Sequence, residues 1–206
     1  MKPQIVVSLA ALLIVLAGCQ KEQPEEQGQT TTEPAPAAKA PGFTLTSFDG
    51  NTVSLTDYKG KIVVLEWFSN KCPFVQYHYE KANTMIDLAE KYKDKGVIWL
   101  AIDSTSYATD QEIKDYAAAH NITYPILDDR PGKVGRAYDA RTTPHMFIID
   151  KDGNIAYNGG IDNAPLGNAE NGLVNYVDKA LSELLAAQPV GTAKTEPYGC
   201  TVKYPN

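Results

Sequence analysis

The sequence predicts an α/β domain with a mixed β-sheet, helices on both faces and an N-terminal β-hairpin. Three apolar runs, 62–68, 97–102 and 146–149, are typical of buried strands, because a strand covered on both faces is apolar almost throughout. Segments with helical spacing follow the first two runs. A hairpin and a closing helix follow the third. This alternation favours a mixed sheet flanked by helices.

The elements are expected in the order hairpin, strand, helix, strand, helix, strand, strand, hairpin strand and closing helix. Their predicted ranges are 43–55, 62–68, 73–93, 97–102, 109–120, 123–127, 146–149, 155–157 and 172–187. Both hairpins turn at an Asp-Gly pair, Asp49-Gly50 and Asp152-Gly153, which favours tight turns. The closing helix is predicted from an apolar stripe that begins at Val174.

Length and charge limit the class of protein. The chain has 206 residues and a formal net charge of -6, and its charged residues are scattered without a basic stripe. Nucleic acid is therefore not an expected partner. Residues 42–188 have the length of one domain with a core of its own.

The first 18 residues are predicted to be a lipoprotein signal peptide. Lys2 gives a positive start, and residues 5–17 form an apolar stretch that is short for a membrane span. Leu16-Ala17-Gly18-Cys19 resembles a bacterial lipobox, in which cleavage leaves Cys19 as the lipidated first residue. Several acyl chains on Cys19 would hold the protein stably on a membrane. The expected location is therefore the bacterial cell envelope, with the domain facing the periplasm or the exterior.

Residues 19–41 are predicted to be a flexible tether, and residues 189–206 a C-terminal tail that carries Cys200. The tether consists mostly of Gln, Glu, Thr, Pro and Ala. Such a segment cannot bury enough apolar surface to offset the entropy of ordering it.

Cys72 is the strongest candidate for a functional residue. It follows the strand 62–68 after a short polar connection, and Pro73 comes next. Proline is favoured in the first turn of a helix, whose free N–H groups stabilise a nearby anion. The pattern predicts a reactive thiolate rather than a small buried apolar residue.

The chain has three cysteines. If Cys19 is lipidated, Cys72 and Cys200 remain, which is the right number for one redox couple in a compartment that permits disulfides. The eleven residues from Pro189 to Gly199 could extend roughly 35 Å, so the tail is long enough to reach Cys72. The alternative for Cys200 is a structural or unpaired thiol.

Four local matches resemble the thioredoxin-like fold over about residues 42–188, and within it the peroxiredoxin-like (redoxin) family, which includes the alkyl hydroperoxide reductase and thiol-specific antioxidant proteins. Residues 67–73, Trp-Phe-Ser-Asn-Lys-Cys-Pro, match the strand-to-helix turn that holds the nucleophilic cysteine of the fold. Glu66 stands where many thioredoxin relatives have a buried acid. Thr143-Pro144 looks like the cis-proline of the family, and residues 198–204 are similar to the tails of small lipoprotein redoxins.

The resemblance implies a thiol-dependent oxidoreductase that reduces peroxides or disulfides through Cys72, with Cys200 as the candidate resolving thiol. Two positions depart from the related motifs. Val75 replaces the second cysteine of Cys-x-x-Cys, so a dithiol reductase that uses one motif is excluded. Ser69 matches the Thr/Ser of Pro-x-x-x-Thr/Ser-x-x-Cys, but Leu65 stands at the proline position, so the peroxide-positioning motif is incomplete.

The resemblance also suggests roles for residues around Cys72. Burial is expected to raise the pKa of Glu66, which could then pass protons to or from the thiol; the alternative is a strand-end carboxylate that faces water. If Pro144 is cis, the Thr143 backbone faces the Cys72 sulfur and can pair with a substrate chain. Thr143, Pro144 and Pro73 are therefore the expected substrate-binding residues.

No cofactor and no metal are expected, because the electrons would come from an external dithiol donor. The other expected partners are a peroxide or protein disulfide and, through Cys19, a membrane. One alternative is a disulfide reductase or isomerase without peroxidase activity. Another is a non-enzymatic copper or assembly chaperone, in which His78 and His145 would join Cys72 in a thiolate–imidazole site.

Overall fold

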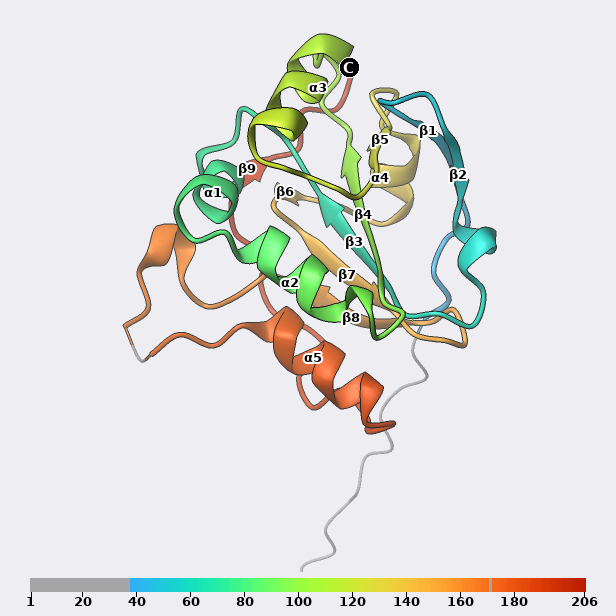
Figure 1. Ribbon diagram of the computed structural model, residues 1–206, viewed down its shortest axis with the longest axis vertical. Coiled ribbons are helices and arrows are strands. Elements are labelled where there is room, and N and C mark those ends of the chain that lie inside the picture. Colours follow the sequence, from blue (N-terminus) through green and yellow to red (C-terminus); the bar gives the residue numbers. More distant parts are fainter. Residues whose placement is uncertain (1–37, 171) are drawn as a thin grey trace, which may run out of the picture. The chain divides into compact units, whose positions relative to one another are not determined.

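The computed structural model describes residues 38–170 and 172–206. The predicted signal peptide, Cys19 and most of the predicted tether lie outside these residues. Within them, seven strands form one mixed sheet in the order β2-β1-β5-β4-β3-β7-β8 (Figure 1). These strands are β1 (Thr44–Ser47), β2 (Thr52–Ser54), β3 (Val63–Trp67), β4 (Ile98–Asp103), β5 (Ile126–Asp128), β7 (Met146–Ile149) and β8 (Ile155–Gly159).

Parallel strands form the centre of the sheet, and antiparallel strands form both edges. Strands β3, β4 and β5 are parallel neighbours. The β1–β2 hairpin pairs antiparallel with β5, and β7 and β8 continue antiparallel from β3. The helices are α1 (Pro73–Gln76), α2 (Thr84–Lys93), α3 (Asp110–Ala119), α4 (Lys133–Ala137) and α5 (Tyr176–Leu185). The predicted fold class and the N-terminal hairpin are confirmed.

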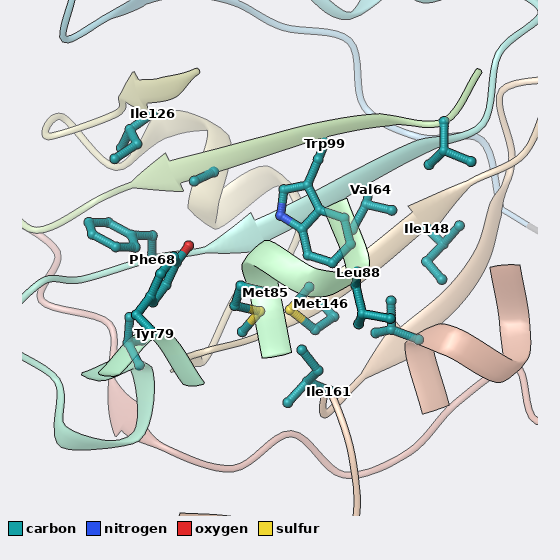
Figure 2. Packing of buried hydrophobic residues seen from close by; sticks show 14 of the residues in the cluster. Val64, Phe68, Tyr79, Met85, Leu88, Trp99, Ile126, Met146, Ile148 and Ile161 are labelled. Carbon is teal, nitrogen blue, oxygen red and sulfur yellow. The ribbon is translucent and has the colours of Figure 1, made fainter. Parts of the chain in front are cut away.

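Apolar side chains form a core on each face of the sheet, and β3 contributes to both. Val64 points into the first core, which α2, α3 and α5 cover (Figure 2). Val63 and Leu65 point into the second core, to which α4 contributes. All five residues of β3 are buried. This explains why the segment is apolar except at Glu66, since neighbouring side chains of a strand point to opposite faces and both faces are covered.

The prediction of one helix over 73–93 is wrong. The segment contains α1, the π-helical turn η2 (Tyr77–Lys81) and α2. The helical backbone is interrupted at Asn83, whose φ is 50°. Apolar residues on both sides of the break, Val75 and Met85, still reach the first core. Because both parts of the segment pack into the same core, the apolar pattern continues across Asn83 and gives no sign of the interruption.

Other elements differ from their predicted ranges in smaller ways. Helix α5 begins at Tyr176 instead of 172, because the side chain of Asn175 caps it by accepting a hydrogen bond from the Asp178 amide (2.8 Å). Val174 therefore lies outside the helix and is exposed. Short elements, α4 and the strands β6 (Thr142–Thr143) and β9 (Cys200–Thr201), were not predicted.

The last residues of the predicted tether take part in the folded domain. The amide of Ala40 donates to the Gly153 carbonyl (3.0 Å), and the Ala38 carbonyl accepts from the Ile155 amide (2.8 Å). Residues 38–40 thus pair with the β7–β8 hairpin. No helix in the described ranges has the length and apolarity needed to cross a membrane.

Candidate active site

Cys72 lies at the turn between β3 and α1, as the sequence predicts. It is the N-cap residue of α1, with extended backbone angles, and Pro73 occupies the first helical position. Its amide donates to the Ser69 carbonyl (3.1 Å) and its carbonyl accepts from the Gln76 amide (2.9 Å). The four residues of α1 continue directly into the π-helical turn η2, so the N–H groups next to Cys72 begin a helical segment that extends to Lys81.

The Thr143–Pro144 peptide is cis, which confirms the prediction. The Cys72 thiol donates a hydrogen bond to the Thr143 carbonyl oxygen, with an Sγ–O distance of 2.9 Å. The Thr143 backbone therefore faces the Cys72 sulfur, as expected. Only 2% of Cys72 is exposed.

The tail brings the second cysteine to the same peptide. Strand β9 pairs antiparallel with β6, so that Cys200 lies opposite Thr143 and Thr201 opposite Thr142. In Figure 1 the red C-terminal segment returns across the domain to place β9 beside β6. Both cysteines of the described residues are free thiols, and Cys200 is the more accessible.

Both thiols line a small cavity of about 50 Å³. Each residue that lines it carries a hydroxyl, an ammonium or a thiol group. The lining residues are Ser69, Lys71, Cys72, Thr105, Tyr107, Thr143, Cys200, Thr201 and Lys203. The Ser69 hydroxyl accepts a hydrogen bond from the Thr105 hydroxyl (3.2 Å). The cavity has room for a molecule of a few heavy atoms.

The environment of Cys200 favours its protonated form. Burial, followed by the hydrogen bond and charge of Cys72, raises the pKa of Cys200 to about 11. Lys203 lowers this pKa to a smaller extent. Cys200 is therefore a thiol at neutral pH, and it can donate a proton.

Glu66 is fully buried on the first-core side of β3, so the alternative that it faces water is wrong. It accepts hydrogen bonds from the Tyr79 hydroxyl (2.9 and 3.0 Å) and the Trp99 indole (3.1 Å) (Figure 2 shows both rings). Burial raises the pKa of Glu66 to about 7, against the effect of these bonds. The predicted rise is confirmed. Within the described residues Glu66 forms no hydrogen bond to Cys72, and its role in proton transfer stays a prediction.

The histidines considered as copper ligands use both ring nitrogens in other contacts. His78 lies between the Thr84 hydroxyl (3.1 Å) and the Tyr198 hydroxyl (2.8 Å). Nε2 of His145 donates to the Asn158 side chain (2.7 Å), and its Nδ1 accepts from the Arg141 amide (3.2 Å). In the part of the chain that the structure describes, no cluster of His, Cys, Asp or Glu is arranged to hold a metal ion. The postulated thiolate–imidazole site is not formed.

Residues 198–205 are bound into the fold, which the sequence reasoning missed. The Val202 amide donates to the Arg141 carbonyl (3.0 Å), and the Lys203 carbonyl accepts from the Ser106 amide (2.9 Å). Val202 is buried in the second core. The Tyr204 hydroxyl donates to the Ala140 carbonyl (2.7 Å). The position of Cys200 is therefore set by contacts on both sides of it.

Gly199 is the sequence signal that could have revealed this arrangement. Its φ is 133°, and a Cβ atom there would overlap the carbonyl group of Thr143. A glycine directly before a candidate redox cysteine indicates a special backbone angle or a close backbone approach. Both occur here.

The sequence model of the AhpC/TSA family matches residues 36–158. The chain belongs to this family. The predicted family membership and thioredoxin-like fold are thereby confirmed. The match ends before the tail, so it does not include Cys200.

Three comparisons describe the similarity in more detail. The chain is 30% identical over 152 residues to thiol-disulfide oxidoreductase ResA of Geobacillus kaustophilus, which covers 74% of this chain and 84% of that protein. It is 32% identical over 117 residues to ResA of Bacillus thuringiensis, which covers 57% of this chain and 65% of that relative, slightly less than two thirds. A solved structure titled as an uncharacterized conserved protein from Geobacillus kaustophilus superposes with a TM-score of 0.74 at 32% identity, and covers 82% of this chain and 92% of that one.

Proposed function

We propose that this protein is a thiol-dependent oxidoreductase of the bacterial envelope, with Cys72 as the nucleophile and Cys200 as the resolving thiol. The observation that supports this most strongly is the meeting of both thiols at one peptide and one small cavity. Cys72 donates to the Thr143 carbonyl, and Cys200 lies opposite Thr143 in the β6–β9 pair. A second thiol beside the first lets an oxidised sulfur be captured as a disulfide.

With a hydroperoxide, the chemistry has three balanced steps. The Cys72 thiolate attacks one peroxide oxygen, the O–O bond breaks, and the alkoxide or hydroxide that leaves takes up a proton. The resulting sulfenic acid condenses with the Cys200 thiol, which forms the disulfide and releases water. An external dithiol then reduces the disulfide by exchange and becomes oxidised itself.

The two thiols differ in ways that suit these roles. The raised pKa of Cys200 keeps it protonated while Cys72 reacts. The Cys200 proton is then available to the hydroxide that leaves the sulfenic acid. Lys203 lines the cavity and its charge lowers the pKa of Cys200, so it favours an anion formed there, whereas the ammonium group of Lys71 is paired with Glu112 (2.7 Å). Ser69, Pro73 and Pro144 belong to the same proposed site, which they shape around the Cys72 sulfur.

Disulfide reduction is the second candidate reaction, and the similarity to proteins named thiol-disulfide oxidoreductase favours it. The Cys72 thiolate would attack one sulfur of a disulfide and release the other as a thiolate. Cys200 would then displace the remaining substrate sulfur from the mixed disulfide. Either reaction requires a proton to leave Cys72 and another to reach the leaving group. The proposed role of Glu66 is to pass these protons to or from the thiol.

The reaction with hydrogen peroxide tests the first candidate. The reduced full-length protein with Cys19→Ser, which removes the only other cysteine, is mixed with one equivalent of peroxide. Intact mass and disulfide maps are followed over time. We expect a Cys72–Cys200 bond, a sulfenic acid trapped on Cys72 in the Cys200→Ser variant, and no rapid oxidation in the Cys72→Ser variant.

Oxidation no faster than that of a free thiol would exclude peroxide as the substrate. The same three proteins with a small disulfide then test the second candidate. If no Cys72–Cys200 bond forms with either oxidant, Cys200 is not the resolving thiol.

We also propose that Cys19 is lipidated and holds the domain on a membrane of the envelope. The lipobox-like sequence Leu16-Ala17-Gly18-Cys19 supports this. The full chain expressed in a bacterium should fractionate with membranes and carry a fatty-acyl mass on Cys19, and Cys19→Ser should lose both. Equal membrane association of the variant would contradict the anchor.

A further inference from the structure

The edge of β6 next to the Cys72 sulfur is already occupied by the chain itself. An extended polypeptide that approached this sulfur could use the same edge, since adding a strand to an exposed edge is a general way to bind a peptide. Here β9 takes that place, with Cys200 opposite Thr143 and Thr201 opposite Thr142. Cys200 therefore lies on the strand that such a polypeptide would have to displace.

We propose that β9 is a built-in substitute for a substrate strand, and that it determines specificity by excluding extended polypeptides from Cys72. This inference rests on the proposed function and narrows it. The oxidant that reaches Cys72 directly is a molecule small enough for the cavity that Cys72 and Cys200 share. A polypeptide dithiol exchanges with the oxidised protein at the more accessible sulfur, that of Cys200.

The different burial of Cys72 and Cys200 supports the assignment of small oxidants to Cys72 and of polypeptide dithiols to Cys200. Cys72 is 2% exposed, and β9 and the Thr143 peptide form part of its cover. The remaining space beside its sulfur is about 50 Å³, which admits a few heavy atoms but no peptide backbone with side chains. Cys200 is only half-buried. A large partner therefore meets Cys200 first.

The position of β9 does not depend on a disulfide. Both thiols are free, and the tail is still held beyond Cys200 by the Val202 amide, the Lys203 carbonyl and the buried Val202 side chain. Before Cys200, Thr195 is bound to β8, since its amide donates to the Asn158 carbonyl (3.1 Å). The strand is attached at both ends, so it competes with a polypeptide at high effective concentration.

Gly199 is the residue that permits this close approach. A side chain there would overlap the Thr143 carbonyl, which is the group that accepts the Cys72 hydrogen bond. Gly199→Ala should therefore separate β9 from β6 without a substitution at position 72 or position 200. Gly50→Ala is a matched control, because Gly50 has a φ of 96° and an added Cβ would meet no atom within 4 Å.

Two methanethiosulfonate reagents, one carrying a methyl group and one an extended decapeptide, test the proposal with the same reacting group. The full-length protein carries Cys19→Ser and Cys200→Ser, so that Cys72 is its only thiol. The Cys72 thiolate attacks the sulfenyl sulfur, a disulfide to the methyl or peptide group forms, and methanesulfinate leaves. Intact mass gives the rate for each reagent.

We expect the methyl reagent to react at least about a hundredfold faster than the peptide reagent when β9 is in place. Gly199→Ala should raise the peptide rate at least about tenfold and change the methyl rate much less. Gly50→Ala should change neither the peptide rate nor the methyl rate. Hydrogen exchange of the Val202 amide, measured on the same proteins, reports whether the tail has separated.

Val202→Thr is a second way to loosen the tail if Gly199→Ala does not fold. Its matched control is Val53→Thr, since both valines are 6% exposed in the second core. A peptide rate close to the methyl rate with β9 in place, or an unchanged peptide rate after the tail has separated, would overturn the proposal. If neither reagent reacts in any variant, Cys72 is not a nucleophile and the proposed function itself fails.

Discussion

The two segments that carry the thiols reach the site in different ways. Cys72 is placed by its immediate neighbours in the chain, because β3 leads directly into the turn that holds it. Cys200 is placed by residues far away in the sequence, chiefly Thr143, Arg141 and Ser106. The first segment lies within the family match over 36–158 and the second lies outside it. One half of the site is thus local and belongs to the family, and the other half depends on how this tail folds back.

The two segments are nevertheless buried to a similar extent. Val75 of α1 has no exposed surface, and Val202 of the tail is 6% exposed. Each packs into one of the two cores, on opposite faces of the sheet. The tail is therefore part of the hydrophobic core and contributes to stability as the Cys72 segment does.

The largest expected effect concerns the buried acid on the Cys72 side. The pKa of Glu66 is about 7 in the folded protein and 4.5 ordinarily. The unfolded chain thus releases this proton first as the pH rises. The stability that protonated Glu66 contributes is fully present below pH 4.5, is lost between pH 4.5 and about 7, and changes no further above that. A tenfold change in proton affinity corresponds to about 1.4 kcal/mol, so this loss is about 3 kcal/mol.

Denaturant unfolding of the wild type and Glu66→Gln across this pH range measures the effect. The difference between their unfolding free energies should shift by about 3 kcal/mol in favour of the variant as the pH rises. His145, whose pKa burial lowers to about 4, acts with the opposite sign, but its contribution cancels in the difference. Glu90→Gln, at an exposed position, is the control for the loss of one carboxylate. A flat difference for Glu66→Gln would mean that Glu66 ionises freely in the folded protein.

A direct comparison of the two segments uses equal truncations. Val75→Ala and Val202→Ala should each lower the free energy of unfolding by about 2 kcal/mol, because each removes two buried methyl groups and leaves a small cavity. Chemical denaturation of both variants measures this. If Val202→Ala costs less than about 0.5 kcal/mol while Val75→Ala costs the expected amount, the tail is an appendage and the comparison fails.

A smaller effect is expected where the tail meets the helical turn that follows Cys72. The Tyr198 hydroxyl donates to the Asp162 carboxylate (2.6 Å) and contacts Nε2 of His78 (2.8 Å). Tyr198→Phe removes both hydrogen bonds and should cost about 1 kcal/mol of unfolding free energy. Thermal or denaturant unfolding gives this value. Tyr107→Phe, at an exposed tyrosine, is the control, and an equal effect of the two variants would show that these hydrogen bonds do not connect the segments.

The sequence predicted well those features that depend on contiguous residues. The strand 62–68, the turn at Cys72 and the helix that begins at Pro73 follow from composition over a few positions. The helix predicted over 109–120 was also confirmed, since α3 covers Asp110–Ala119, and a capping box of Thr109 and Glu112 fixes its start. Single short elements such as α4 were missed, since five residues are too few to show a periodic pattern.

Interactions between distant residues could not be predicted in the same way. The left-handed conformation of Asn83 interrupts an apolar pattern that itself continues, because both parts face one core. The ring nitrogens of His78 and His145 form hydrogen bonds to residues as distant as Tyr198, and within the described residues neither ring joins Cys72 in a cluster. Nothing in the local sequence of either histidine indicates these partners.

The amino-acid pattern alone thus accounts for the α/β class and for Cys72 at the end of a buried strand, and it places a glutamate within that strand, whose burial the tertiary structure decided. The class and the place of Cys72 follow from short-range periodicity. The pairing of β9 with β6, the small cavity and the opposition of Cys200 to Thr143 were decided by the tertiary structure. Strand pairing between residues 57 positions apart depends on long-range packing of the tail against α4 and β8, which no local pattern encodes.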